Sequence, residues 1–188
     1  RRIKAVRDAV WPDIGLMLDP NNVWRASTAV QVANRLRDLD IMFLEEPVFA
    51  DDIPGLAQFK RGTDIPLATG EHEYTKFGVR DLILAQAADY VQCDVTRCGG
   101  FTEMLKIIGM TQAWNLAFAP HGMEYMHMHL MSAAPNAVFL ERLFMFEEVS
   151  EMVLKEAPQP VNGYLELPDR PGLGLVWDMD RIKEICVK

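Results

Sequence analysis

Residues 41–47 read IMFLEEP, a run of four apolar residues followed by two glutamates and a proline. A short run that is apolar at every position is typical of a parallel strand buried on both faces. Similar runs recur at residues 14–18, 41–44, 65–68, 90–93, 116–119 and 137–140. We expect each run to form a strand.

Longer amphipathic stretches separate these runs, at residues 24–39, 54–61, 76–87, 102–114 and 124–133. In the first stretch Ala29, Ala33 and Leu36 recur at helical spacing, and Arg25 and Arg37 lie on the other side. Alternating strands and helices predict βα units around a parallel sheet. An open doubly wound sheet and a (β/α)8 barrel both fit this pattern. No glycine-rich phosphate loop follows any run, which disfavours a nucleotide-binding sheet.

A carboxylate or a histidine follows each apolar run, namely Asp19, Glu45, Glu71, Asp94, His121 and Glu141. The intervals between them are 26, 26, 23, 27 and 20 residues, so each spans about one βα unit. The same position therefore recurs at the carboxyl ends of successive strands, where barrel enzymes place their catalytic residues. Acidic residues are also common in loops and at helix N-termini, but recurrence in register favours the functional interpretation.

The residue types indicate the chemistry. Asp19, Glu45 and Glu71 offer hard oxygen ligands with no Cys or His among them, a set that suits Mg²⁺ better than Zn²⁺. Asp94 and His121 follow on the next two strands, and a carboxylate beside an imidazole fixes its tautomer and raises its basicity. His121 is therefore a candidate general base.

Composition narrows the classes of partner. The chain has 27 Asp and Glu against 19 Lys and Arg, and a net charge of −8 argues against a nucleic-acid-binding protein. No apolar run approaches the ~20 residues of a membrane span, and the N-terminus has no apolar signal segment. Cys93, Cys98 and Cys186 form no C-x-x-C motif and are interpreted as reduced thiols. We expect a cytoplasmic protein that binds neither nucleic acid nor membranes.

Several motifs carry a family resemblance. They are LDPN (18–21), FLEEP (43–47), TGEHE (69–73), DVTRCGG (94–100), APHG (119–122), LERL (140–143) and PDRPGLG (168–174). Together they span nearly the whole chain in the expected order. The chain resembles the C-terminal barrel of the enolase superfamily, in its mandelate racemase subgroup, which includes muconate lactonizing enzyme. The segments GEHE (70–73) and TRCGG (96–100) resemble those of sugar-acid dehydratases such as rhamnonate dehydratase.

The resemblance implies roles for the residues at the strand ends. Asp19, Glu45 and Glu71 would bind Mg²⁺. Asp94 and His121 would form the base dyad. Glu141 would donate a hydrogen bond to the substrate carboxylate as it becomes an enediolate.

Other polar residues lie beside these positions. Asn21, His72 and Arg97 are candidate substrate contacts, and the alternative is that each is simply a polar residue at the surface or lining the site. Residues 123–131, MEYMHMHLM, contain a His-x-His pair. Positions i and i+2 of a helix point to different sides, so packing, or one histidine near the substrate, is favoured over a metal site.

The length predicts an incomplete barrel. A full eight-unit barrel needs about 200–250 residues, whereas this chain of 188 residues has six strand starts. We expect residues 1–188 to be a single partial barrel domain of a longer enzyme, formed by the last six or so βα units of a modified (β/α)7β barrel. The N-terminal capping domain and the first barrel strands of the family would be absent.

The resemblance implies a Mg²⁺-dependent hydro-lyase. Such an enzyme abstracts the proton α to a carboxylate of a sugar acid and then eliminates the β-hydroxyl as water. One alternative is a racemase or epimerase of a 2-hydroxy acid that uses the same first step. Another is a non-catalytic fragment that keeps only the fold. The expected partners are a small carboxylic sugar acid and, in a homo-oligomer, further copies of the chain.

Overall fold

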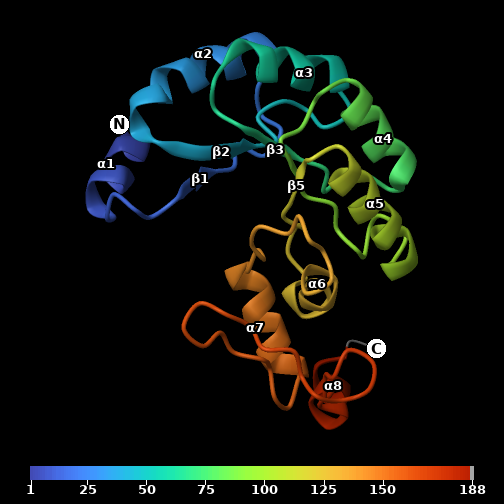
Figure 1. Ribbon diagram of the computed structural model, residues 1–188. Helices are drawn as coiled ribbons and strands as arrows, with labels where there is room; N and C mark the ends of the chain where they lie inside the picture. The colour runs from blue at the N-terminus through green and yellow to red at the C-terminus, as the bar shows by residue number, and fades with distance from the viewer. Residues whose placement is uncertain (187–188) are drawn as a thin grey trace.

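Five short parallel strands form the centre of the structure, a computed structural model that describes residues 1–186. The strands are β1 (Leu16–Leu18), β2 (Ile41–Glu45), β3 (Leu67–Thr69), β4 (Tyr90–Val91) and β5 (Ala117–Phe118). They pair in chain order, β1-β2-β3-β4-β5. Figure 1 shows them as a curved arc with helices around its outer side, the arrangement of a partial TIM-type barrel.

Eight α-helices and one 3₁₀-helix are found among the described residues. They are α1 (Arg2–Ala9), α2 (Ala26–Leu36), η1 (Arg37–Leu39), α3 (Ile53–Gly62), α4 (Lys76–Leu84), α5 (Phe101–Ala113), α6 (Glu124–Met131), α7 (Phe144–Val153) and α8 (Met179–Ile185). Helices α2 to α5 follow the outer side of the arc, and α6 to α8 lie together beyond β5 (Figure 1). None of the helices among residues 1–186 combines the length and apolar character that a bilayer-spanning segment needs.

Two apolar clusters hold the helices against the strands. The first contains Ala29, Leu44 and Phe59, from α2, β2 and α3. The second contains Val91 and Met104, from β4 and α5. Because successive strand residues face opposite sides, Leu44 packs under the helices while its neighbours along β2 face the inside of the arc.

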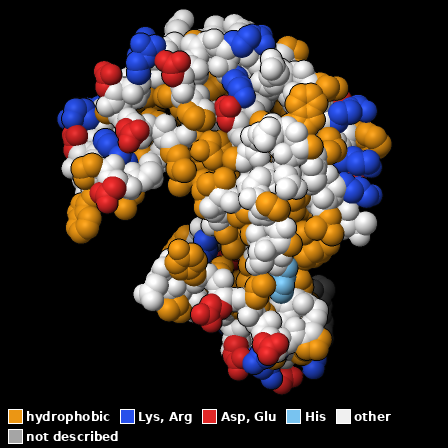
Figure 2. All heavy atoms as spheres, in the orientation of Figure 1, with side chains coloured by type: hydrophobic (Ala, Val, Ile, Leu, Met, Phe, Trp, Pro, Cys, Tyr) orange, Lys and Arg blue, Asp and Glu red, His pale blue; other side chains and the backbone are white. Residues whose placement is uncertain are grey.

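The inside of the arc is partly filled by aromatic rings. The ring of Phe43 lies 5.1 Å from that of Tyr90 and 5.9 Å from that of Phe139. Phe139 belongs to the segment after β5, so its contact with β2 shows how strongly the sheet curves. Figure 2 shows hydrophobic side chains along the hollow on this side of the molecule.

Residues 137–140 do not form the sixth strand that we expected. They contribute one bridge, between Ala137 and Phe118, with a hydrogen bond of 3.0 Å from Val138 N to Phe118 O. Among residues 1–186 no strand lies beyond this segment, so its other side has no partner that would extend the pairing. The sheet therefore has five strands among the described residues.

Two helices were missed by the sequence pattern, α1 and α7. Neither helix buries any residue, so neither contributes to the two apolar clusters. Helix α8, near the C-terminus, pairs its basic residues Arg181 and Lys183 with Glu184 and Asp180.

Helix α4 offers a matched test of the first apolar cluster. Leu82 is 1% exposed and Leu84 is 64% exposed. We expect Leu82→Ala to lower the free energy of unfolding by about 2–5 kcal/mol, because it leaves a cavity under the helix. Leu84→Ala should change it by less than about 0.5 kcal/mol. Urea denaturation measures both values, and equal losses would contradict the described packing.

Candidate active site

Two of the strand-end residues form a buried hydrogen-bonded pair. His121, which follows β5, places its Nδ1 3.0 Å from Oδ2 of Asp94, which follows β4. The other oxygen of Asp94 accepts hydrogen bonds of 2.7 Å from the backbone N–H and the hydroxyl of Thr96. Asp94 is thus held from both sides, and its orientation toward the imidazole is fixed.

The surroundings make this pair an acid–base unit. Burial opposes the charge on Asp94, but hydrogen bonds from His121 and Thr96 outweigh it and lower the pKa of Asp94 to about 2. Burial likewise opposes the charge on His121, yet the bond to Asp94 and the nearby Glu71 and Glu141 raise the pKa of the imidazole. An ionised Asp94 therefore favours a His121 that readily accepts a proton at its free nitrogen.

The free nitrogen of the pair faces a further carboxylate. His121 Nε2 lies 3.2 Å from Oε2 of Glu71, which follows β3. Oε1 of Glu71 lies 3.0 Å from a guanidinium nitrogen of Arg97. The structure thus brings together three residues that the sequence assigned to different roles: a base, a metal ligand and a substrate contact.

Four carboxylates repel one another at the same strand ends. Burial raises the pKa of Glu45 to about 7, repulsion from Glu141, Asp19 and Glu71 adds to it, and a hydrogen bond from Gln92 opposes it. The pKa of Glu141 is raised chiefly by burial, and the charges of Glu71 and Asp19 contribute. Such a group of carboxylate oxygens, two of them from the buried Glu45 and Glu71, suits a hard divalent cation, which would offset the repulsion.

The carboxylates differ in what they face. Asp19, Glu45 and Glu141 line one pocket of about 430 Å³, together with the rings of Phe43 and Phe139. The oxygens of Glu71 instead meet His121 and Arg97, so a metal ion shared by Asp19, Glu45 and Glu71 would have to compete with these contacts.

A second group of possible ligands lies next to the first. Glu46, Glu71 and His72 each offer an atom within 4.8 Å of the others. Glu46 is 1% exposed, accepts a hydrogen bond of 2.6 Å from Asn22 and lies 3.0 Å from Nδ1 of His72. Its contacts join the loops that follow β1, β2 and β3, which indicates a bracing role for this carboxylate.

The three candidate substrate contacts border these carboxylates. The backbone N–H of Asn21 donates to Asp19 Oδ1 at 2.7 Å, and Asn21 has a left-handed φ of 54°. His72 turns toward Glu46, and Arg97 toward Glu71. Their contacts with a substrate stay predictions.

Sequence reasoning gave no role to Gln92 at the strand ends, and it considered His127 only as part of a His-x-His pair. Gln92 lies two residues before Asp94, so strand periodicity places both on one face, and it lines the same pocket as Glu45. The alternation along residues 90–94 could have found it. His127 is fully buried in α6, and its partners lie in other loops. No spacing in the sequence signals those contacts.

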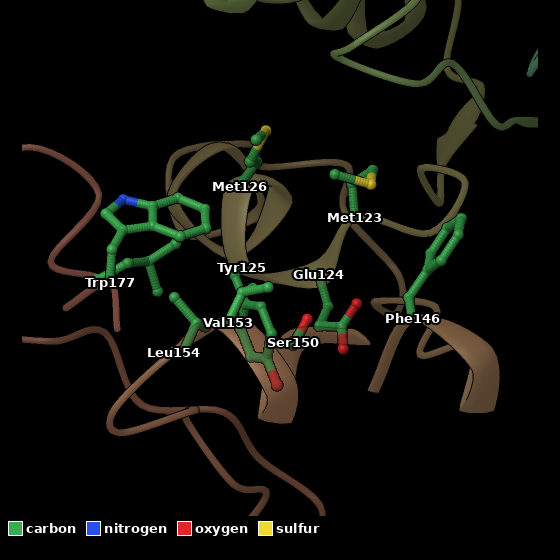
Figure 3. A pocket seen from close by; sticks show the side chains of 10 residues that line it. Met123, Glu124, Tyr125, Met126, Phe146, Ser150, Val153, Leu154 and Trp177 are labelled. Carbon is green, nitrogen blue, oxygen red and sulfur yellow. The ribbon is translucent and has the colours of Figure 1, made fainter. Parts of the chain in front are cut away.

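A separate small cavity lies between α6, α7 and the C-terminal segment (Figure 3). Its volume is about 80 Å³, and its lining includes Met126, Phe146, Leu154 and Trp177. It contains none of the predicted site residues.

Comparison with known proteins supports the resemblance seen in the motifs. The family model for the enolase C-terminal domain-like family matches residues 1–181. The L-rhamnonate dehydratase of Saccharopolyspora erythraea is 34% identical over 182 residues, which cover 93% of this chain and 47% of that protein. The L-talarate/galactarate dehydratase of Salmonella typhimurium is 35% identical, over 93% of this chain and 43% of that protein.

Solved structures show the same architecture. A Bradyrhizobium enolase crystallised with magnesium and mandelic acid superimposes with a TM-score of 0.92 at 30% identity, covering 99% of this chain and 50% of that one. This chain spans about half the length of the curated relatives it matches. From the family match, the curated relatives and the shared barrel, the chain belongs to the enolase C-terminal domain-like family of the enolase superfamily.

Proposed function

We propose that this chain carries the metal- and base-bearing part of a Mg²⁺-dependent hydro-lyase that dehydrates a sugar acid. The observation that carries the proposal is the buried His121–Asp94 pair, whose free nitrogen faces the carboxylates at the strand ends. Two relatives named as sugar-acid dehydratases, at 34% and 35% identity, support the reaction class.

The proposed Mg²⁺ ligands are Asp19, Glu45 and Glu71. Burial, and after it repulsion from the neighbouring carboxylates, raises the pKa of Glu45, which supports a cation at this place. The all-oxygen donor set fits Mg²⁺. When bound, Mg²⁺ supplies positive charge that stabilises negative charge developing on a substrate carboxylate.

The base step falls to His121. Its Nε2 takes the proton α to the carboxylate, and the electrons of the broken C–H bond spread into the carboxylate group. Asp94 holds Nδ1–H and stabilises the imidazolium that forms, because its own pKa is lowered to about 2. General-base catalysis of this kind contributes about 10²–10⁴-fold in rate.

The remaining step removes the β-hydroxyl. A proton returned by His121, or supplied by another acid, leaves with that hydroxyl as water, and the resulting enol tautomerises to a 2-keto-3-deoxy acid. Glu141 supports the charge that builds on the substrate carboxylate. Its raised pKa favours the protonated form, which can donate a hydrogen bond to that group.

The alternatives differ in their products. A racemase or epimerase shares the proton abstraction but needs a second base on the opposite face of the substrate. These functions are distinguished by incubating the longest product of the gene that contains this chain with a set of sugar acids and Mg²⁺ in D₂O. A keto-acid product without inversion supports the dehydratase. An inverted, deuterated substrate would replace it with a racemase, and the absence of both exchange and metal binding would indicate a non-catalytic fragment.

The proposal has three further parts. Residues 1–188 form a partial domain of a longer enzyme, the enzyme assembles into a homo-oligomer, and it works in the cytoplasm. The proposed partner is a small carboxylic sugar acid.

Replacing one proposed ligand tests the metal site. We expect Glu45→Gln to weaken Mg²⁺ binding on the order of tenfold or more, because it removes a charged oxygen ligand. Glu166→Gln is the matched control, since Glu166 is exposed in the C-terminal segment. Titration calorimetry measures both affinities. Unchanged binding in Glu45→Gln would remove Glu45 from the ligand set.

Replacing the proposed base tests the proton transfer. We expect His121→Asn to lower α-proton exchange with D₂O by at least about 10²-fold and to leave Mg²⁺ affinity nearly unchanged, since the imidazole moves the proton and the carboxylates hold the ion. His129→Asn, on helix α6, is the control and should exchange normally. NMR of the substrate reports the exchange. Retained exchange in His121→Asn would assign the base elsewhere.

A further inference from the structure

One fully buried histidine connects the two loops that carry the base pair. His127 lies in α6 with 0% of its surface exposed. The backbone N–H of Val95 donates to its Nε2 at 2.9 Å, and its Nδ1 lies 2.7 Å from the carbonyl oxygen of Gly122. Val95 directly follows Asp94, and Gly122 directly follows His121. The imidazole therefore contacts the chain immediately beside each member of the pair.

The partners of His127 define its protonation. A backbone N–H can only donate, so Nε2 must accept and carry no proton. A carbonyl oxygen can only accept, so Nδ1 must carry the proton and donate. Only the neutral imidazole with its proton on Nδ1 satisfies both bonds. Burial lowers the pKa of His127, against the opposing effect of the Gly122 carbonyl, which agrees with a neutral ring.

The loop that His127 holds has an unusual backbone. Gly122 and Met123 both lie in the left-handed region, with φ of 48° and 44°. A Cβ at Gly122 would come within 2.9 Å of the ring of Phe146, so a larger residue does not fit there. Such a conformation persists only where surrounding contacts enforce it. The bonds from His127 supply two of these contacts, because its backbone N–H also donates to Met123 O at 3.0 Å.

The same loop extends to the third proposed catalytic residue. The backbone N–H of Gly122 donates to Oε2 of Glu141 at 2.7 Å. A continuous path of hydrogen bonds thus runs from Val95 through His127 and Gly122 to Glu141. The path uses main-chain atoms beside the proposed catalytic side chains, and the imidazole at its centre is fully buried.

We propose that His127 is a positioning residue that joins the loop after β4 to the loop after β5 and so holds Asp94 and His121 within hydrogen-bond distance. The inference rests on the proposed function, in which His121 is the base. The inference goes beyond the proposed function because it assigns the alignment of His121 to a residue that does not touch the reacting atoms.

The first test measures the protonation state of His127 directly. In the chain labelled with ¹⁵N-histidine, NMR should show His127 as a neutral ring protonated on Nδ1 across about pH 6 to 8. This measurement needs no activity and no variant. A His127 protonated on both nitrogens at neutral pH, or on Nε2 alone, would overturn the proposal.

The second test uses three variants of the longest gene product. His127→Leu keeps the size but removes both bonds, and we expect kcat to fall about 10–100-fold with KM nearly unchanged. His127→Gln should recover most of kcat, because its amide can donate to Gly122 and accept from Val95. His129→Leu, two residues along α6, is the matched control and should behave as wild type.

The outcomes separate positioning from packing. If His127 only packs, both the His127→Leu and the His127→Gln variants lose stability, but kcat does not fall while KM stays unchanged. Equal kcat values for these two variants would overturn the proposal. If the His127→Leu variant does not fold, the proposal is still tested by the kcat of the His127→Gln variant and by the protonation of His127 in the wild-type protein. If the wild-type enzyme has no activity on sugar acids, the proposed function fails. The NMR signal of His121 Nδ1–H then tests the positioning role of His127 without any activity. We expect this signal to be lost in His127→Leu and kept in His127→Gln.

Discussion

Parallel pairing of β1 to β5 is the constraint from which the site follows, because it brings the carboxyl ends of all five strands to one edge. In this chain that edge carries acidic side chains that are largely buried. Burial, and to a smaller extent their mutual repulsion, raises the pKa values of Glu45 and Glu141. A sheet that gathers like charges in this way needs positive charge or protons at its edge, and both are what the proposed reaction uses.

Much of the fold was predictable because its signals are local. The apolar runs around Phe43 and Val91 mark strands that are buried on both faces, and the helices between them show one-sided periodicity. The same local signal wrongly predicted a sixth strand at residues 137–140. Residues 137–140 are as apolar as the others, but only Ala137 forms a bridge, with Phe118, and the sequence of a run does not record how many of its residues pair. Helices α1 and α7, to which no helix was assigned from the sequence, bury none of their residues.

The site was predictable in its residues and less so in its contacts. Recurrence at strand ends identified Asp94 and His121, and the structure places them in direct contact. The same recurrence identified Glu71, but its side chain faces His121 and Arg97, a choice of rotamer that no spacing specifies. The contacts of His127 escaped prediction because one of its two partners lies 32 residues away and both are main-chain atoms, which every residue type carries.

Glu46 has a consequence of another kind. It is a glutamate at a φ of 34°, where a side chain costs on the order of 1–3 kcal/mol, and its buried carboxylate is held by Asn22 and His72. A glycine there would relax the main chain but remove the brace between neighbouring loops. The two effects on stability oppose each other at this position, so a more heat-resistant version of the protein should gain its stability elsewhere.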